Sequence, residues 1–228
     1  MTLVFRLNSI LIISAVFLSN IAFGQSESPE LKTEQDKLLY FMGIQLGESL
    51  MPLRLNNEEF QLVMHGTRDA VQGNTIEVDP RVYGPRLAQF GEERHQELLA
   101  DERPKATEYL ARMAAEDGAQ TMESGLIFFP LKAGTGTIPA ASSLIELNFS
   151  GTLRDGTVFD SSFDRGQPIQ VPLDKVIPCW QEGFVMIKVG GKARLTCPAE
   201  LAYQDRGVGN IPPGAAITFE VELLKIIK

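Results

Sequence analysis

The sequence of 228 residues contains little of the chemistry on which most hydrolases and metalloenzymes depend. Its two histidines, His65 and His95, both lie in the first half of the chain. The second half has none, which excludes a histidine-based catalytic triad or a histidine-rich metal site there. The segment Gly134-Thr135-Gly136 is too short for a phosphate-binding loop, and no helix start follows it. We therefore expect neither a cofactor nor a bound metal ion.

The chain also lacks a basic cluster and a long hydrophobic run. Its formal net charge is −8, which argues against nucleic acid and anionic membranes as main partners. The apolar run Ile10–Leu18 is too short to cross a bilayer. With Arg6 before it and Ala22-Phe23-Gly24 after it, this run is typical of a cleaved signal peptide over residues 1–24. We expect an exported protein with no stable membrane span, and the alternative is an uncleaved anchor.

Cysteine is equally scarce, with Cys179 and Cys197 as the only two. Two cysteines are too few to define a disulfide scaffold. In an oxidising compartment they could form one bridge, and otherwise they would be two buried thiols that pack as small apolar residues. The sequence leaves both alternatives open.

Residues 25–118 have the spacing of apolar residues that is typical of helices. Leu38, Met42 and Leu46 form one stripe. A second helix is expected after Asn56, because Glu59 completes a capping box with it. Asp79-Pro80 marks the start of a third, long helix, since proline is favoured at the first helical position. Its apolar positions are so sparse that we expect a solvated arm.

Residues 119–228 instead alternate between apolar and polar side chains, which predicts half-buried antiparallel strands. The alternation is clearest at 145–149, 192–197 and 217–223. A short helix is expected from Pro178 to Lys188. The fold class is therefore α+β, with an N-terminal all-α domain and its long connecting helix, followed by a curved antiparallel sheet over a short helix.

Five segments of this C-terminal region, in the right order, resemble the FKBP family of peptidyl-prolyl cis–trans isomerases. They are Asp155–Ser162, Val176–Trp180, Ala202-Tyr203, Gly209–Gly214 and Thr218–Leu224. The resemblance covers essentially all of residues 125–228. It implies an isomerase domain at 119–228 that acts on proline-containing polypeptides and binds rapamycin-type macrolides.

The N-terminal region resembles the helical domain of the macrophage infectivity potentiator (Mip) group. The likeness rests on Phe41–Gly47 and on the run from Ala106 to Gly125. Members of that group are periplasmic or surface-attached homodimers joined through these helices. The resemblance therefore implies a dimerisation domain at 25–118, a homodimer, and the periplasm of a Gram-negative bacterium, with association with the outer-membrane surface left open.

Carried over by position, the resemblance implies a pocket with Trp180 as its floor. Catalytic roles fall on Asp160, Ile177, Tyr203 and Phe219. Substrate-binding roles fall on Phe149, Phe159, Ile169, Val176, Trp180 and Ile211. The backbone N–H of Ile177 would hold the substrate carbonyl, Asp160 would place a carboxylate near the rotating carbonyl, and the Tyr203 hydroxyl would bond the substrate backbone. Taken singly, each residue also has a structural interpretation as core or as an ion-paired loop, and the ordered set carries the functional one.

Three positions depart from the usual family pattern. Phe149 replaces a tyrosine whose hydroxyl pairs with the pocket aspartate, and Cys179 and Gln204 each replace a glycine. We expect reduced but not absent activity. Two functions follow: an isomerase that assists the folding of exported proteins, or a dimeric periplasmic chaperone with marginal isomerase activity.

Overall fold

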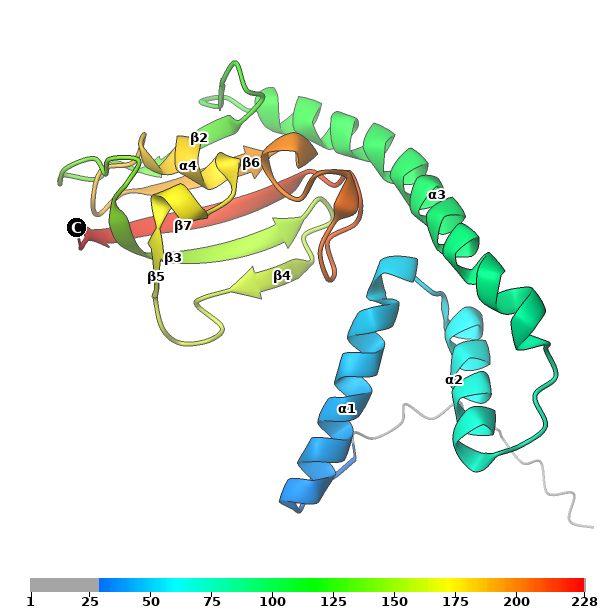
Figure 1. Cartoon of the computed structure of the whole chain (residues 1–228). Helices are drawn as coiled ribbons and strands as arrows, with labels where there is room; N and C mark the ends of the chain where they lie inside the picture. Colours follow the sequence, from blue (N-terminus) through cyan, green and yellow to red (C-terminus); the bar gives the residue numbers. More distant parts are fainter. Residues whose placement is uncertain (1–28, 228) are drawn as a thin grey trace, which may run out of the picture. The chain divides into compact units, whose positions relative to one another are not determined.

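The computed structural model describes residues 29–227, so the signal peptide expected over residues 1–24 lies outside the described residues. The N-terminal region contains three helices, and the C-terminal region contains a sheet and a short helix (Figure 1). The helices are α1 (Glu34–Leu50), α2 (Asn57–Gln72), α3 (Pro80–Ala114) and α4 (Pro178–Phe184). The strands are β1 (Gln120–Thr121), β2 (Ile127–Lys132), β3 (Leu144–Leu153), β4 (Val158–Ser161), β5 (Ile169–Pro172), β6 (Lys192–Cys197) and β7 (Ile217–Ile226).

The chain divides into two compact units, residues 1–42 and 43–228, and α1 crosses the boundary. The predicted helix signals of the second unit are present. Asn56 and Glu59 form the reciprocal capping box at the start of α2, and Gly73 ends that helix in a left-handed conformation. The Asp79 side chain accepts a hydrogen bond from the Arg81 backbone, with Pro80 at the first helical position of α3. None of the helices within residues 29–227 is long and apolar enough to cross a membrane.

The sheet of the C-terminal region is antiparallel and has the strand order β1-β2-β6-β7-β3-β4, with β5 also paired to β3. The alternating segments of the sequence form its centre, because β7 pairs with both β3 and β6. On β3, every second residue from Ile145 to Gly151 is buried. The helix α4 lies against the sheet (Figure 1), and its seven residues end at Phe184, four residues before the predicted end. The α+β fold class is confirmed.

One apolar core fills the space between the sheet and α4. Its fully buried side chains include Leu126, Leu147, Leu173, Phe184 and Leu195. At Gly183 of α4, an added Cβ would come within 2.6 Å of a Leu195 methyl carbon. Because this approach requires glycine, α4 and β6 pack with almost no space between them.

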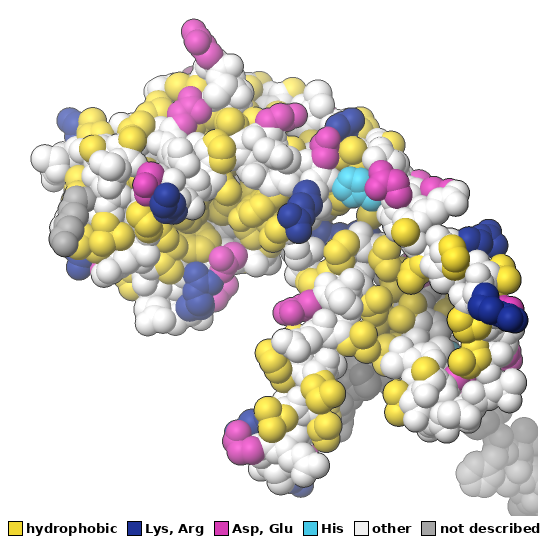
Figure 2. Space-filling view, in the orientation of Figure 1, with side chains coloured by type: hydrophobic (Ala, Val, Ile, Leu, Met, Phe, Trp, Pro, Cys, Tyr) yellow, Lys and Arg dark blue, Asp and Glu magenta, His cyan; other side chains and the backbone are white. Residues whose placement is uncertain are grey.

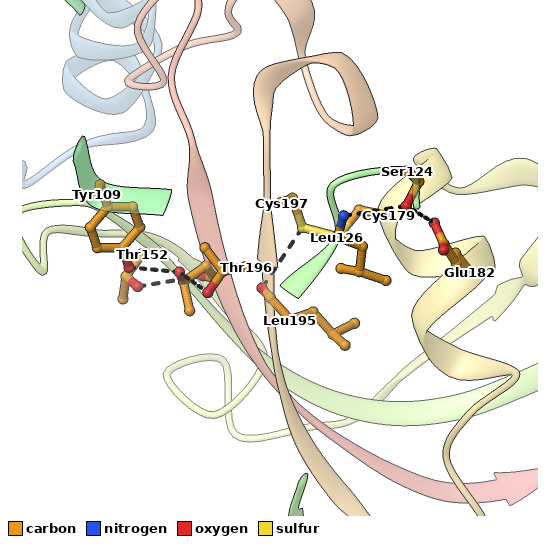
Figure 3. The surroundings of a disulfide bond; sticks show 10 residues. Tyr109, Ser124, Leu126, Thr152, Cys179, Glu182, Leu195, Thr196 and Cys197 are labelled. Carbon is orange, nitrogen blue, oxygen red and sulfur yellow. Dashed lines mark hydrogen bonds between the residues drawn. A yellow bond between two sulfur atoms is a disulfide. The ribbon is translucent and has the colours of Figure 1, made fainter. Parts of the chain in front are cut away.

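One end of the opposite face of the sheet is buried, contrary to the expected alternation. Thr196 and Thr218 were expected on the polar face, yet both are buried. The Tyr109 hydroxyl of α3 lies 2.7 Å from Thr218 Oγ1, which lies 2.9 Å from Thr196 Oγ1 (Figure 3). The second half of α3 therefore covers this end of the face, and the hydroxyls satisfy one another within the contact.

The expectation of a solvated arm is thus wrong for the second half of α3. Leu99, Ala106 and Tyr109 are buried, although Leu87 earlier in the helix is 67% exposed. The buried carboxylate of Glu102 accepts a hydrogen bond of 2.9 Å from the Arg154 guanidinium. The periodicity did not indicate this contact because a few large side chains make it, one of them the charged Glu102.

We predict that Tyr109→Phe lowers the free energy of unfolding by about 1 kcal/mol, the net worth of one hydrogen bond. The Thr196–Thr218 contact would remain, so neither threonine would be left unpaired. Urea denaturation of the purified protein would measure the change. Tyr83→Phe is the matched control, because the Tyr83 side chain is 52% exposed and its change should stay within about 0.5 kcal/mol. Equal effects of the two substitutions would contradict the prediction.

Candidate functional site

An apolar pocket opens in the C-terminal region, and all ten residues predicted for the site line it. They come from β3 (Phe149), β4 (Phe159, Asp160), β5 (Ile169), the start of α4 (Val176, Ile177, Trp180), the loops after β6 (Tyr203, Ile211) and β7 (Phe219). Segments separated by up to 70 residues of sequence thus meet at one site. The sheet positions this site, since three of these segments are neighbouring strands.

Trp180 lies at the centre of an aromatic cluster. Its ring centroid is 5.1 Å from that of Phe149 and 5.1 Å from that of Phe219, with interplanar angles of 73° and 78°. Phe184 supports it from the core at 5.5 Å. These edge-to-face contacts suit the ring quadrupoles and fix the orientation of the indole. The indole is 6% exposed, and its N–H has no hydrogen-bond partner among the described residues.

The wall beside this floor is equally constrained. Phe159 and Phe219 meet edge to face at 5.6 Å. Gly151 of β3 lies beneath both rings, and a Cβ there would come within 2.6 Å of Phe159 and 2.9 Å of Phe219. Any larger residue there would force one or both rings to move. The absence of a side chain at Gly151 therefore sets the position of this wall.

The carboxylate of Asp160 has a partner in the loop that follows β4. Arg165 forms an ion pair and a hydrogen bond with Asp160, and its guanidinium carbon lies 5.5 Å from the Phe149 ring centroid. The expected loss of the tyrosine hydroxyl at position 149 is therefore offset by Arg165. Because both side chains of the pair are nearly half exposed, the pair contributes little to stability and mainly orients the carboxylate.

Two further polar groups face the pocket with no partner of their own. The Ile177 backbone N–H, just before α4, makes no hydrogen bond among the described residues. Partial burial raises the pKa of the Tyr203 hydroxyl above its usual value, and the negative charge of Asp160 raises it further. With an ordinary pKa of about 10, this hydroxyl remains protonated and able to donate at neutral pH.

The rim of the pocket adds residues that were not predicted. Lys175, Val208, Gly209 and Asn210 line it, and Val208 pairs with Ile211 in a short bridge. Val208 is 54% exposed. The position of Lys175 immediately before Val176 could have predicted that it lies at the rim. Nothing in the sequence around Val208 predicts its place there, because the path of the loop alone brings it to the rim.

The two departures from glycine have different structural consequences. Gln204 has a φ of 52°, the left-handed region that glycine adopts freely and other residues resist. The backbone next to Tyr203 is therefore held in a conformation that its side chain disfavours. Cys179 lies within α4, where no special backbone angle is needed. It forms a disulfide with Cys197, which settles the alternative left open by the sequence.

We predict that Phe149→Tyr raises kcat/KM only slightly in the native protein but more strongly in an Arg165→Met background. A tyrosine hydroxyl would offer Asp160 the hydrogen bond that Arg165 now supplies, so the two donors are partly redundant. A double-mutant cycle on an Xaa–Pro peptide would measure the coupling, expected at about 1 kcal/mol. Additive effects would show that the two donors act independently. Lys175→Met is the control for losing a cation at the rim.

The chain is similar to known proteins over most of its length. The family model for FKBP-type peptidyl-prolyl cis-trans isomerase matches residues 136–224, and the model for the domain amino terminal to FKBP-type peptidyl-prolyl isomerase matches residues 35–128.

The FKBP-type 22 kDa peptidyl-prolyl cis-trans isomerase of Escherichia coli (strain K12) is 36% identical to this chain, and the match covers 88% of this chain and 99% of that protein. The peptidyl-prolyl cis-trans isomerase Mip of Coxiella burnetii is 33% identical, covering 87% and 89%. The crystal structure of FkpA from Escherichia coli matches with a TM-score of 0.64 at 34% identity, covering 86% of this chain and 98% of that one.

Proposed function

The chain belongs to the FKBP-type peptidyl-prolyl cis–trans isomerase family, and we propose that it isomerises Xaa–Pro bonds of exported proteins in its aromatic pocket. The single observation that carries this mechanism is the buried Trp180, fixed edge-on by Phe149 and Phe219 beside few polar groups. Such a pocket suits a reaction in which no bond to the substrate is made or broken.

The physical chemistry of the reaction explains why an apolar pocket accelerates it. Rotation about an amide faces a barrier of roughly 18–20 kcal/mol, because resonance must be lost at the twisted transition state. The twisted amide has less charge separation than the planar one. An environment poor in water therefore destabilises the planar ground state more than the transition state, which lowers the barrier between them. No nucleophile is needed, in agreement with the lack of histidine in this half of the chain.

The polar groups of the pocket would position the substrate. In our proposal the free N–H of Ile177 donates to a carbonyl of the substrate, and the protonated hydroxyl of Tyr203 donates to its backbone. Asp160, oriented by Arg165, lies near the carbonyl that rotates. Each hydrogen bond would hold the peptide while the proline ring stays on Trp180, so that rotation is confined to the amide bond. A rapamycin-type macrolide would occupy the same pocket.

We predict that Trp180→Leu lowers kcat/KM for an Xaa–Pro peptide by about tenfold or more, or about 1.4 kcal/mol. The smaller side chain leaves the proline ring without a flat, dry floor. A protease-coupled or fluorescence assay would measure the loss, and macrolide inhibition would weaken with it. Phe128→Leu is the matched control, because Phe128 is buried in the same core and belongs neither to the pocket lining nor to the aromatic contacts of Trp180. An unchanged kcat/KM in Trp180→Leu would refute the pocket mechanism.

We further propose that the protein works outside the cytoplasm, in the periplasm of a Gram-negative bacterium. A buried disulfide joins Cys179 to Cys197, and such bonds form and persist in oxidising compartments and are rare in the cytosol. The expected signal peptide supports the same conclusion independently. Exported chains whose slow folding steps are proline isomerisations would be the substrates.

The exposed apolar surface of α1 supports the proposal of a homodimer. Figure 2 shows hydrophobic side chains gathered on this helix. None of its residues is buried, and Leu38, Phe41 and Met42 are 65%, 53% and 65% exposed. A monomeric soluble protein rarely leaves so many large apolar side chains of one helix in water. A second copy of the chain would cover them.

We predict that the mature chain, residues 25–228, has twice the mass of one copy in light scattering. Leu38→Glu/Met42→Glu should shift it to the monomer, because two carboxylates would be buried without partners. Lys37→Glu/Gln45→Glu adds the same residues at polar positions of the same helix and should leave the dimer intact. A monomeric native protein would contradict the prediction. The full chain is needed, since truncation near Gly118 would expose Leu99 and Tyr109 of α3.

The second candidate function is a dimeric chaperone that holds unfolded chains between its two copies, and the apolar surface of α1 favours it because this surface would join the copies. In that case suppression of aggregation of a proline-free client should survive Trp180→Leu and fail in Leu38→Glu/Met42→Glu. The opposite pattern would assign client binding to the pocket.

A further inference from the structure

The Cys179–Cys197 disulfide lies directly beneath the catalytic pocket. Cys179 is the second residue of α4 and Cys197 the last of β6, and their Cα atoms are 5.8 Å apart. Both side chains are fully buried. Figure 3 shows the bond between α4 and the end of β6, next to Leu126 and Leu195. It is the only disulfide of the chain, since no other cysteine exists.

The bond connects the two chain segments that supply opposite sides of the pocket. On one side Cys179 lies between Ile177, whose N–H is free, and Trp180, the floor. On the other side Cys197 leads through Pro198 and a single 3₁₀ turn, Ala199–Leu201, to Tyr203. A covalent cross-link therefore fixes the distance between the floor and the wall that carries the hydroxyl.

Apart from its packing against the core, the helix that bears the floor has few restraints. It has seven residues, whereas isolated helices shorter than about 12–15 residues are marginal in water. Its polar links outside the core are the Ser124–Glu182 hydrogen bond of 2.6 Å and the bond of 2.7 Å from the Gln181 side chain to the Val176 carbonyl. Both are exposed and compete with water. The disulfide is the one covalent cross-link that holds this helix, in addition to its packing against the core.

We propose that Cys179 and Cys197 are positioning residues for isomerisation, and that the enzyme is fully active only in the oxidised form. This inference rests on the proposed pocket mechanism. Reduction by a dithiol breaks the Sγ–Sγ bond. Two electrons and two protons pass to the cysteines as two thiols, and the dithiol becomes a cyclic disulfide. Trp180 and Tyr203 then keep their packing but lose their fixed separation, so that the pocket binds the peptide less well, whether its amide is planar or twisted.

The test compares three forms of the full mature chain: oxidised, reduced by dithiothreitol, and the variant Cys179→Ala/Cys197→Ala. Exchange spectroscopy by NMR on an Xaa–Pro peptide is the assay, because dithiothreitol would damage a coupling protease. Measurements at about 10 °C, near the usual temperature of maximum stability, keep every form folded, and alkylation followed by mass spectrometry counts the thiols. We expect kcat/KM to fall on the order of tenfold in the reduced protein and in the variant, mostly through KM. Reoxidation should restore the native protein, and dithiothreitol should not affect the variant.

A purely stabilising role makes a different prediction. Leu223→Ala is the matched control, because Leu223 is fully buried in β7 and does not line the pocket, so it lowers the denaturation midpoint without touching the site. If the disulfide acts only through stability, the reduced protein and Leu223→Ala will both keep native kcat/KM while folded, and the inference is overturned. Should the double variant not fold, the reduced native protein gives the same answer.

The sole tryptophan supplies a second readout. Trp180 is the residue next to Cys179, and disulfides quench excited indoles by electron transfer. Its emission should rise on reduction, and its near-ultraviolet circular dichroism should weaken as the ring loses its fixed orientation among Phe149 and Phe219. If the oxidised and reduced proteins have the same dichroism and the same KM, the positioning role of the disulfide is wrong. An unchanged kcat/KM in Trp180→Leu would contradict the pocket mechanism itself. A loss in Trp180→Leu with no change on reduction would contradict only the positioning role of the disulfide.

Discussion

The pocket depends on the position of a helix that is too short to hold itself. With seven residues, α4 gains little from its own hydrogen bonds, so its place is set by what it packs against. Gly183 lets it approach Leu195 of β6, and Trp180 enters the cluster of Phe149, Phe184 and Phe219. The floor of the pocket therefore belongs to the same core that stabilises the sheet. In the proposed function, substrate binding and folding therefore use one set of aromatic contacts.

The central strands serve two sites at once, because successive side chains of a strand point to opposite faces. On β7, Phe219 lies in the pocket, and its neighbour Thr218 meets Tyr109 of α3 on the other face. On β6, Leu195 packs beneath α4 while Thr196 bonds to Thr218. The contact of α3 is thus one residue away from the pocket wall. The long helix is consequently integral to the isomerase fold from Leu99 onward, although it belongs to the N-terminal region by sequence.

The sequence predicted what depends on local pattern and missed what depends on packing at a distance. The alternation at 145–149, 192–197 and 217–223 marks the three central strands, and the ordered motifs brought all ten predicted residues to one pocket. The short outer strands β4 and β5 have four residues each, too few for a clear alternation. Burial of Thr218 follows from α3, nearly 110 positions away. For the same reason the sequence could not show whether a disulfide forms, because only the fold brings Cys179 and Cys197 close enough to bond.

The three departures from the family pattern indicate which kind of interaction limits this pocket. At position 149 the tyrosine hydroxyl that would bond Asp160 is missing. Arg165 pairs with Asp160 instead and stacks on Phe149, and this exposed ion pair contributes only modest energy. At Gln204 the backbone adopts a left-handed conformation. The surrounding loop holds it there although a residue other than glycine disfavours it. At position 179, cysteine in place of glycine adds a disulfide next to Trp180, the floor of the pocket. Because the polar change is offset and the apolar geometry is reinforced, the proposed mechanism relies on the shape of the aromatic pocket more than on any single hydrogen bond.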